Sequence, residues 1–596
     1  MNARGVEATS ADAPVARGRF NSDWAQLWIG VALIAATGFG PSLLGNDYWA
    51  HTFHVVNIYI AASVFQNLLF VDAGQKSFGQ GAILGLGAYG AAIAYGLQGV
   101  PFILAAVIGV LAALLGGLLF ALPALRVQGF HLGFVTMSAG IVFPQLIVTL
   151  DKWTNGINGI RVAVPALTET WLLHQSPLSV ILAIFPMLAL GVHYALRQSR
   201  LGRMMRVAAA SPEAARSLGV KPGVMRCIGF VIASIGTGIC GVLYLPTVGF
   251  VSATAFPLEL SFVFFFAVVV GGRGQLLGPI VGVWIIYILP NILLAQLIEY
   301  RLLIYGCLTL LAVMLFPDGI VGSIEHWRRK RAHKGGGDQA FRLESFIGHL
   351  PVVPEQTRAE RPVIEVRGGG KRFGQVIALD KVDLTVRQGE VHGLVGANGS
   401  GKTSLLNVLT GLSRLDAGTM SISGAEATRM PADAIANSGV GRTFQAPRVF
   451  AELSLWDNLR IGVDGRAQPS RGHLDQLAAD LERRFGQDSA SLLSHGQRRL
   501  LEVTRTVLKE APILLFDEPA AGLSPAERKQ FSALVTFLSK RMGKTIVLVE
   551  HDLDLVWGLA DTITVLEAGR VVASGEPAAV ARDPAVQHMF VGARRA

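Results

Sequence analysis

The sequence predicts a multi-domain protein in which an all-α polytopic membrane domain precedes an α/β domain. Two patterns support this division. Apolar stretches long enough to span a bilayer recur from about Trp24 to Phe316. Further along the chain, a glycine-rich loop occupies Gly396 to Thr403. It follows an apolar strand, Glu390 to Val395, and precedes a helix-like segment. Composition agrees: 51% of the 596 residues are hydrophobic, 16% are charged and mean hydropathy is +0.46. The chain is therefore more apolar and less charged than an ordinary soluble one.

The membrane domain is expected to cover residues 24–330, after a polar leader at 1–23. The leader carries Arg17 and Arg19, and the apolar stretch behind it is too long for a signal-peptide core, so we expect a retained helix. About ten spans are expected, at 24–44, 53–70, 78–97, 102–122, 132–150, 177–196, 227–246, 257–273, 276–296 and 301–316. The shortest of these, 257–273 and 301–316, have the weakest signal.

The glycine-rich run Gly74 to Gly90 differs from an ordinary span. Its Gly81-x-x-x-Gly85 spacing permits close helix approach, and it carries the polar residues Gln75, Lys76 and Gln80. A broken or re-entrant helix is therefore an alternative to a plain span. The polar groups are expected either to line a cavity or to join helices, and the sequence favours neither of these two roles over the other.

Charge distribution indicates orientation. The net charge is +10 and the pI is near 9.6, but basic residues lie beside apolar spans, as in Arg328 to Arg331, which is typical of cytoplasmic loops rather than of a nucleic-acid-binding surface. With the N-terminus inside, the arginine-rich loop 197–226, Arg126 and the α/β domain are cytoplasmic, and Asp151 to Ser176 lies outside. The three isolated cysteines predict neither disulfides nor a metal site.

The loop in the α/β domain fits the phosphate-binding pattern G-x-x-x-x-G-K-[ST]. Backbone N–H groups of such a loop converge on phosphate, and the helix expected to begin near Lys402 adds its positive dipole end. Lys402 suits the β- and γ-phosphates of ATP, and the Thr403 hydroxyl suits Mg²⁺. The expected ATP-binding residues here are Gly396, Ala397, Asn398, Gly399, Ser400, Gly401, Lys402, Thr403 and Ser404.

Five further segments follow the order and spacing of one ATPase family. They are Phe373, Gln445 in Arg442-Thr-Phe-Gln445, the segment Leu493-Ser-His-Gly-Gln497, the strand Ile513 to Glu518 with Asp517 and Glu518 at its end, and His551 after the strand Thr545 to Glu550. In this set the chain resembles ATP-binding-cassette (ABC) proteins. The resemblance implies adenine stacking on Phe373, Mg²⁺ binding by Thr403, Gln445 and Asp517, and catalytic roles for Glu518, His551 and Gln445.

The same resemblance implies that the signature residues Ser494, His495, Gly496 and Gln497 contact ATP held by an opposing subunit. Two positions depart from the family pattern. His495 replaces the usual glycine, and Ser524 stands where many members have aspartate. Both bear on the geometry of the contact across subunits, and neither removes a group that hydrolysis needs.

The membrane domain resembles the M-type permease of branched-chain amino-acid ABC importers. The glycine run 74–90, Thr154 to Gly159, Val270 to Gln275 and Phe316 to Ile320 carry this resemblance. The cassette, expected at 362–596, resembles the G-type ATPase of the same systems, including Ala520 to Pro525. The segment 331–361 between them is rich in glycine and proline and is expected to be a tether.

The cytoplasmic segment Ser211 to Gly219 carries helix signals: serine as N-cap, proline in the first turn and glycine at the exit. The resemblance implies a coupling helix that docks on a cassette near its glutamine loop; an ordinary surface helix is the alternative. The residues assigned to it are Ser211, Glu213, Ala214, Ala215, Leu218 and Gly219. Whether it docks on its own or a partner's cassette is left open.

The resemblance implies ATP- and Mg²⁺-dependent uptake of a small polar or amphiphilic solute, such as a branched-chain amino acid, across a bacterial cytoplasmic (inner) membrane. The chain would be a half-transporter. It would need a second permease subunit, a second ABC ATPase and an extracytoplasmic solute-binding protein. Urea, amides and small carboxylates are alternative solutes. An ABC exporter, marked by six long spans with extended cytoplasmic helices, and a non-transporting membrane-anchored ATPase are alternative functions.

Overall fold

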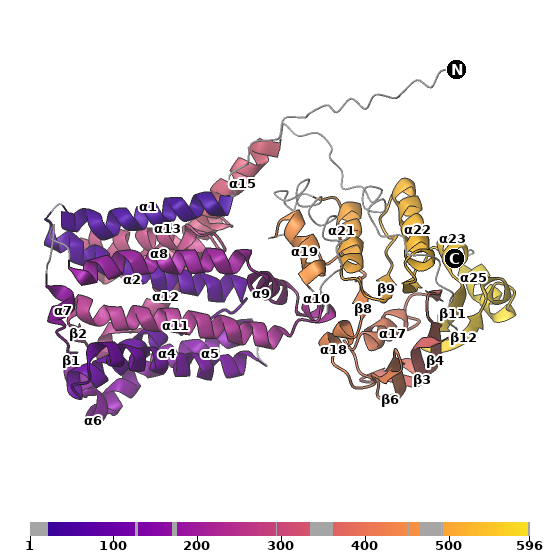
Figure 1. Ribbon diagram of the computed structural model, residues 1–596, viewed down its shortest axis with the longest axis horizontal. Helices are drawn as coiled ribbons and strands as arrows, with labels where there is room; N and C mark the ends of the chain where they lie inside the picture. Colours follow the sequence, from indigo (N-terminus) through magenta and orange to yellow (C-terminus); the bar gives the residue numbers. More distant parts are fainter. Residues whose placement is uncertain are drawn as a thin grey trace, which may run out of the picture.

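The computed structural model describes residues 22–43, 45–125, 129–169, 176–293, 295–333, 361–450, 453–464, 490 and 493–593. The leader up to residue 21, Arg126 and residues 334–360 of the expected tether lie outside the described residues. The chain forms two bodies, with the helical N-terminal part on the left of Figure 1 and the α/β part on the right.

The N-terminal part is a bundle of helices. Its main elements are α1 (Ser22–Leu43), α2 (Asp47–Asn67) with η1 (Leu68–Asp72), α3 (Gln80–Ala92) with η2 (Ile93–Leu97), α4 (Phe102–Ala124), α5 (Phe130–Thr149), α8 (Pro177–Gln198), α11 (Pro222–Val248), α12 (Leu258–Gly271), α13 (Gly278–Val283), η5 (Trp284–Leu293), η6 (Ala295–Tyr300), α14 (Arg301–Leu315) and α15 (Gly319–His333). Among the long apolar helices of the described chain, the span formed by α2 and η1 is the most enclosed, because 89% of its most apolar 18-residue stretch is buried. The apolar side chains exposed on α4, α5 and α14 form the surface that lipid would cover.

Eight helices of the described chain are long and apolar enough to cross a membrane, where ten spans are expected. The expected spans 78–97 and 276–296 account for the difference. Residues 74–79 are not helical, so α3 begins only at Gln80, and π-helical geometry starts at Ile93. The helix at 278–290 is apolar but short and continues as the π-helical η5, which contains Pro290. Residues 74–79 of the glycine run thus form a break between η1 and α3, in line with the broken-helix alternative, and residues 80–90 belong to α3.

Close glycine contacts hold α3 inside the bundle, between α4 and α11. A methyl group added at Gly87 would lie 2.5 Å from the carbonyl oxygen of Gly238, and one at Gly241 would lie 2.1 Å from that of Leu84. Neither position accepts a side chain without separating the helices. Such small-residue contacts are typical of helix packing in membranes.

The end of the bundle far from the α/β part carries short elements, α6 (Asp151–Thr154), α7 (Pro165–Thr168), β1 (Ile160–Arg161) and β2 (Phe250–Val251) (Figure 1). The two strands pair antiparallel, with Ile160 opposite Val251. This is the end that charge distribution predicts to lie outside.

Two sheets form the α/β part. The first is six-stranded, in the order β12-β11-β5-β10-β9-β8, and is parallel except for β12. Its strands are β5 (Val391–Val395), β8 (Val440–Arg442), β9 (Ile513–Asp517), β10 (Thr545–Val549), β11 (Thr562–Glu567) and β12 (Arg570–Gly575). The second is antiparallel, in the order β4-β3-β6-β7, and contains β3 (Pro362–Phe373), β4 (Val376–Arg387), β6 (Ala417–Ile422) and β7 (Ala425–Glu426).

Helices cover the six-stranded sheet. They are α17 (Lys402–Leu409), α18 (Ala432–Asn437), α19 (Leu455–Asp464), α21 (His495–Leu508), α22 (Pro525–Lys540), α23 (Leu553–Leu559), α24 (Pro577–Val580) and α25 (Pro584–Ala593). The central strands β5, β9 and β10 are buried along their whole length, as expected for parallel strands covered on both faces. Phe516 and Phe531 pack edge to face at 5.8 Å between β9 and α22.

The two bodies meet through α9 (Arg200–Ala210) and α10 (Pro212–Ser217), which project from the bundle between α8 and α11 (Figure 1). Ten buried apolar residues from both bodies form one cluster, which we call the docking cluster: Met204, Val207, Ala208, Ala214, Ala215, Leu218, Phe444, Phe450, Leu453 and Ile461. The α/β part is therefore attached by packed side chains as well as by the covalent chain.

Candidate functional site

The phosphate-loop pattern folds as the sequence predicts, between β5 and α17. Helix α17 begins at Lys402 and ends at Leu409, because Thr410 is its C-cap and Gly411 turns with φ +68°. Gly401 has φ +106°, and a methyl group there would lie 2.6 Å from the carbonyl oxygen of Ala378. The loop is thus wedged against the start of β4, which leaves room only for glycine.

Lys402 points into its own loop. Its Nζ donates to the carbonyl oxygens of Gly396 at 2.7 Å and Ala397 at 2.8 Å, and the residue is 5% exposed. Burial lowers the pKa of Lys402, and the nearby carboxylates Glu518 and Asp517 oppose that shift. The amine is therefore held at the loop by acceptors that a phosphate group would replace.

Asp517, at the end of β9, is 1% exposed and has one free oxygen. Arg442 lies 3.3 Å from Oδ2, and Oδ1 has no hydrogen-bond partner among the described residues. Burial raises the pKa of Asp517, while Arg442 acts in the opposite direction. An orphaned carboxylate oxygen, together with the exposed Thr403 hydroxyl at the start of α17, fits a hard cation that prefers oxygen ligands.

No group of three or more His, Cys, Asp or Glu side chains in the described part of the chain is placed to hold a metal ion. A cation at Asp517 would therefore need ligands of other kinds, such as the Thr403 hydroxyl, water or phosphate. That is how Mg²⁺ is usually held in phosphoryl-transfer sites.

Glu518, Gln445 and His551, predicted to act together, lie in direct contact. Glu518 Oε1 accepts a hydrogen bond from Gln445 Nε2 at 3.1 Å and lies 2.8 Å from His551 Nε2. The backbone of Glu518 has φ +48°, a left-handed conformation that is uncommon for a residue with a side chain. Because such strain persists only where the surroundings impose it, the turn after β9 holds this carboxylate in place.

Glu550, which precedes His551, was not singled out from the sequence. Its two carboxylate oxygens accept from the backbone N–H groups of Ala520 at 2.6 Å and His551 at 3.3 Å. Burial raises the pKa of Glu550 to about 7. The residue therefore ties the turn after β10 to the turn after β9, and a carboxylate directly following a buried strand is the signal that would have indicated it.

Phe373 and the signature segment lie on exposed edges. Phe373, at the end of β3, is 52% exposed, with the Lys371 ammonium 5.4 Å from its ring centre. Ser494 is the N-cap of α21 and forms a reciprocal capping box with Gln497. Gly496 is buried, whereas Ser494 and His495 are exposed. None of these contacts the phosphate loop through a hydrogen bond recorded in the described residues.

The two departures from the family pattern have local explanations. Ser524 caps α22, where its Oγ accepts from Glu527 N at 3.4 Å and Glu527 Oε2 accepts from Ser524 N at 2.8 Å. His495 packs on Gly522, where an added methyl group would lie 2.9 Å from its Nδ1. The imidazole thus fills space that the smaller residues of this loop leave open.

The predicted coupling segment is helix α10, and it docks on the cassette of its own chain. Ser211 is the N-cap, with its Oγ 3.3 Å from Ala214 N, and Gly219 leaves the helix with φ +83°. Ala214 and Ala215 are 1% and 0% exposed within the docking cluster. The docking partner, left open by the sequence, is therefore the chain's own α/β part.

Polar contacts frame this dock. Glu213 lies 3.2 Å from Arg448, and the carbonyl oxygen of Gly219 accepts from Asn437 Nδ2 at 3.3 Å. Lys509 Nζ donates to the carbonyl oxygen of Ser217 at 3.0 Å and also to those of Ala436 and Val440 at 2.9 Å. Burial lowers the pKa of Lys509 to about 7. Three acceptors match the three donors of an ammonium group, so this lysine fastens the end of α10 to the cassette.

The dock is continuous with the candidate catalytic residues. Phe444 belongs to the docking cluster and directly precedes Gln445. The Arg499 guanidinium on α21 donates to the carbonyl oxygens of both residues, and Glu502 Oε1 accepts from Phe444 N at 3.3 Å. Movement of α10 or α21 therefore reaches the side chain that contacts Glu518.

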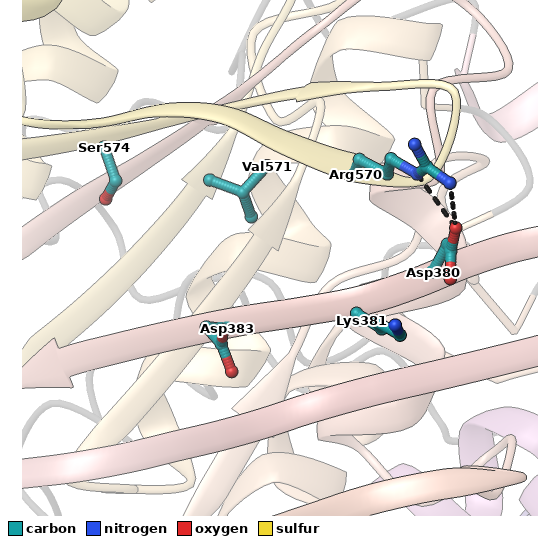
Figure 2. Close-up of a pocket in the computed structure, with 6 residues that line it drawn as sticks. All are labelled: Asp380, Lys381, Asp383, Arg570, Val571 and Ser574. Atoms are coloured by element: carbon teal, nitrogen blue, oxygen red, sulfur yellow. Dashed lines mark hydrogen bonds and ion pairs between the residues drawn. The ribbon is translucent and has the colours of Figure 1, made fainter.

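A pocket of about 580 Å³ lies between β4 and β12, lined by Asp380, Lys381, Asp383, Arg570, Val571 and Ser574 (Figure 2). Arg570 and Asp380 form an ion pair of 2.6 Å across it. Backbone hydrogen bonds connect the pocket to the phosphate loop, from Asp380 N to Gly569 O and from Gly569 N to Ser400 O. It buttresses that loop and holds none of the predicted site residues.

Family comparison agrees with this arrangement. Residues 49–313 match the model for the permease component of branched-chain amino acid transport systems, and residues 379–521 match the model for ABC transporters. The high-affinity branched-chain amino acid transport ATP-binding protein LivG of Salmonella typhimurium is 35% identical over 253 residues, which covers 39% of this chain and 98% of LivG.

The corresponding protein BraF of Pseudomonas aeruginosa is 34% identical over 251 residues, covering 39% of this chain and 98% of BraF. A crystal structure of a nucleotide-free ATP-binding cassette from an ABC transporter is 27% identical and covers 39% of this chain and 99% of that one, with a TM-score of 0.35.

Proposed function

The chain belongs to the ABC transporter family as a branched-chain amino acid type permease fused to an ATP-hydrolysing cassette, and from this premise we propose that it imports a small amphiphilic solute. The solute class is that of branched-chain amino acids. The observation that carries the proposal is the contact between α10 and the chain's own cassette, because it gives ATP hydrolysis a direct mechanical connection to the membrane domain. Similarity of both halves to branched-chain amino acid transport proteins supports the solute class.

In this proposal the loop Gly396 to Ser404 binds the phosphates of ATP, and Lys402 exchanges its two loop carbonyls for phosphate oxygens. Phe373 stacks on adenine. Thr403, Asp517 and Gln445 would hold Mg²⁺, and the ion would supply positive charge beside the phosphates. Glu518 orients or deprotonates the attacking water, and His551, which contacts Glu518, contacts the γ-phosphate.

A second cassette completes the site. Ser494 and His495 of the signature segment are exposed, and the hydrogen bonds of the described signature residues join Ser494 to Gln497 rather than to the chain's own phosphate loop, which supports a role across a subunit interface. The chain therefore acts as a half-transporter with a second permease and a second ATPase. An extracytoplasmic solute-binding protein would deliver solute at the end of the bundle that carries β1 and β2. The proposed location is a bacterial inner membrane.

The direct test is uptake of labelled leucine into proteoliposomes that contain the full chain, its partner permease, its partner cassette and the binding protein. We expect ATP-dependent accumulation that excess valine competes away and that urea or acetate does not. Competition by urea or acetate alone would assign a different solute class. ATP-dependent accumulation of leucine in inside-out vesicles, whose cassettes face the medium, would instead indicate export, and hydrolysis that no solute changes would indicate a non-transporting ATPase.

The same assay tests partnership. The chain alone should hydrolyse ATP slowly and accumulate no leucine, because one cassette lacks an opposing signature segment. Addition of the partner subunits should restore both activities. Rapid leucine uptake by this chain as its own homodimer would contradict the heteromeric arrangement.

A further inference from the structure

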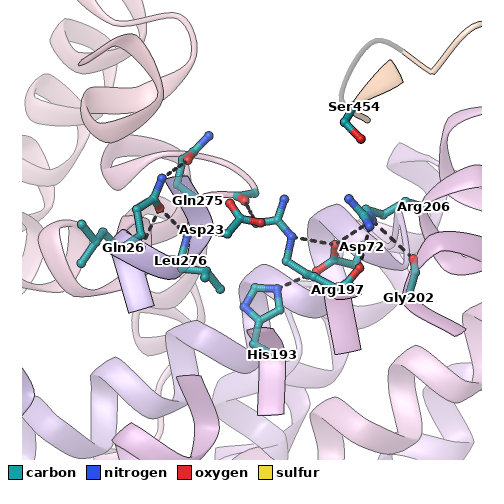
Figure 3. Close-up of polar contacts among 12 residues, drawn as sticks. Asp23, Gln26, Asp72, His193, Arg197, Gly202, Arg206, Gln275, Leu276 and Ser454 are labelled. Atoms are coloured by element: carbon teal, nitrogen blue, oxygen red, sulfur yellow. Dashed lines mark hydrogen bonds and ion pairs between the residues drawn. The ribbon is translucent and has the colours of Figure 1, made fainter. Parts of the chain in front are cut away.

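A buried carboxylate, Asp72, lies where the membrane helices approach the cassette (Figure 3). Asp72 ends η1, directly after α2, and is 1% exposed. Its Oδ2 lies 2.6 Å from His193 Nε2 on α8, and its Oδ1 lies 3.9 Å from the Nε atoms of both Arg197 and Arg206. Ionisable groups enclosed in a membrane domain are costly and usually serve a function, and neither nucleotide binding nor the α10 dock uses this one.

Polar bonds connect Asp72 to two further elements of the bundle. Arg197 lies 3.8 Å from Asp23 on α1 and donates to the carbonyl oxygen of Gly274, in the loop between α12 and α13. Gly274 also donates from its N–H to Asn67 Oδ1 on α2 at 3.0 Å. The cytoplasmic ends of α1, α2 and α8 and this loop are therefore joined around one carboxylate.

Gln26 strengthens the same junction from α1. Its Oε1 accepts from Leu276 N at 3.0 Å, and its Nε2 donates to Gln275 Oε1 at 2.7 Å (Figure 3). Asn67 Nδ2 donates to the carbonyl oxygen of Gln275 at 3.0 Å. Because side chains of α1 and α2 both bind backbone groups of the loop Gly272 to Leu277, the loop follows these helices when they move.

Helix α9 links this junction to the cassette. On its cassette side, Arg203 is 2% exposed and donates to Asp464 Oδ2 at 2.8 Å, and Met204, Val207 and Ala208 belong to the docking cluster. On its membrane side, Arg206 approaches Asp72 and donates to the carbonyl oxygen of Arg197 at 2.8 Å. One short helix thus contacts both bodies through different faces.

The contact between Asp72 and the two arginines is incomplete in this conformation. Asp72 Oδ1 accepts no hydrogen bond from any described residue. Charge-assisted hydrogen bonds have lengths of about 2.7–2.9 Å, so each arginine, at 3.9 Å, is about 1 Å beyond bonding distance. Arg197 ends α8 and Arg206 lies on α9. A displacement of α9 that brings Arg206 toward Asp72 would therefore add a hydrogen bond at Asp72, in place of the 3.4 Å bond that Arg206 Nε donates to the carbonyl oxygen of Gly202.

We propose that Asp72 is a positioning residue that transmits movement of the cassette-bound helix α9 to the cytoplasmic ends of α1, α2 and α8 and to the loop Gly272 to Leu277. Asp72 acts through Arg206 and Arg197 and touches neither nucleotide nor solute. Helix α9 is then a second element, beside α10, through which movement of the cassette reaches the membrane domain. The inference rests on the proposed import function, but the movement it describes is measurable without knowledge of the solute.

The test measures a distance across the link in the assembled complex, with the native cysteines Cys227, Cys240 and Cys307 replaced. Spin labels are placed at Ala210, exposed at the end of α9, and at Arg273, exposed in the linked loop. Distances are compared without nucleotide and after trapping with ATP and vanadate. In the otherwise wild-type protein we expect the trapped and nucleotide-free distances to agree within about 2 Å, because the link keeps α9 and the loop together.

Asp72→Asn removes the charge and keeps the shape. We expect it to match the wild type without nucleotide and to show a distance that shifts or broadens after trapping. Arg206→Gln should behave in the same way, and the double variant should be no worse than either single one, since residues that act as a unit are not additive. Asp318→Asn, at an exposed carboxylate of the same cytoplasmic side, should leave both states unchanged.

Two results would overturn the proposal. One is an Asp72→Asn distance equal to the wild type in both states. The other is a distribution already broadened without nucleotide, which would assign Asp72 to static support only. Leucine uptake in the same preparations separates this inference from the import function. If the wild type takes up no leucine but shows the expected distances, the proposed import function is wrong and the proposed role of Asp72 still stands.

Discussion

Ala215→Arg tests whether the contact between α10 and the cassette carries transport. Ala215 is 0% exposed in the docking cluster, so an arginine there would have to bury its charge or push α10 out of its dock. Three cations already face the aromatic rings of this cluster. The Arg442 and Arg448 guanidinium groups lie 5.2 and 5.6 Å from the ring centre of Phe444, and Arg505 faces Phe450 at 5.1 Å.

The added charge would therefore meet like charges as well as lose its water. A buried charge without a partner costs about 3–5 kcal/mol, and each 1.4 kcal/mol is a factor of ten. The equilibrium between docked and undocked α10 should shift toward undocked by about two to three and a half powers of ten. Because Lys402 and Asp517 lie outside the docking cluster, ATP binding should stay unchanged.

The measurement compares leucine uptake and phosphate release in proteoliposomes of the assembled complex. We expect uptake below about one hundredth of the wild-type rate, loss of solute-stimulated hydrolysis, and basal hydrolysis reduced less than tenfold through the neighbouring Gln445. Arg216→Gln, on the exposed face of α10, should transport normally, and Ala215→Leu should separate size from charge. Wild-type uptake by Ala215→Arg would show that α10 is a solvated connector.

Three further predictions concern the cassette. Glu518→Gln should bind ATP normally while phosphate release falls by about 10²–10⁴-fold, and release within twofold of the wild type would remove Glu518 from the reaction. Lys402→Ala should lose nucleotide binding in a fluorescent-nucleotide titration, and unchanged affinity would contradict the site. Glu550→Gln tests the pKa of about 7, which lies above the usual 4.5. A raised folded-state pKa gives stability that is fully present below the unfolded pKa of about 4.5 and is lost as pH rises to the folded pKa of about 7, so the melting midpoint of the wild type relative to Glu550→Gln should fall between about pH 4.5 and 7 and stay level above that. Parallel midpoints would show that this carboxyl does not titrate there.

Local signals in the sequence predicted local structure well. The strand and helix on either side of the phosphate loop follow from an apolar run, three glycines and a lysine within 20 residues of each other. Helix α10 follows from serine, proline and glycine at set positions, and the structure places Ser211 as its N-cap and turns Gly219 with positive φ. Such signals act through neighbouring backbone atoms, so they need no knowledge of the tertiary fold.

The spans were less predictable where the helix is irregular. A hydropathy pattern reads composition along the chain and does not register a change from α- to π-helical geometry, as at Ile93 and Trp284. It also does not show where a helix begins within a glycine-rich run. The polar residues of that run were expected to line a cavity or to join helices. Among the described residues the Gln75 side chain bonds only to the carbonyl oxygen of Ala73, two residues earlier, so this side chain makes no helix-joining hydrogen bond there.

The arginines of α9 show what sequence patterns could not provide. From the sequence they were interpreted only as evidence for a cytoplasmic loop, because the number of positive charges indicates the side of the membrane and does not identify the partners of the individual arginines. Their partners, Asp464 and Asp72, lie 261 and 134 residues away along the chain, and no local pattern joins such distances. An aspartate at the end of an apolar span and a histidine inside another, Asp72 and His193, are the one signal that would have drawn attention to this junction.

Docking of α10 on the chain's own cassette bears on which ATP site of the proposed complex acts on which permease. Because permease and cassette are one chain, their association is intramolecular and does not depend on concentration. The signature residues Ser494 to Gln497, by contrast, are proposed to act on ATP held by a partner cassette. Each ATP site of the proposed complex would then combine this chain's Lys402 and Glu518 with a partner's signature segment, while α9 and α10 respond only to this chain's cassette. A substitution of Lys402 should therefore impair the same ATP site whose closure moves this permease. A substitution of Ser494 should instead impair the ATP site that contains the partner's phosphate loop.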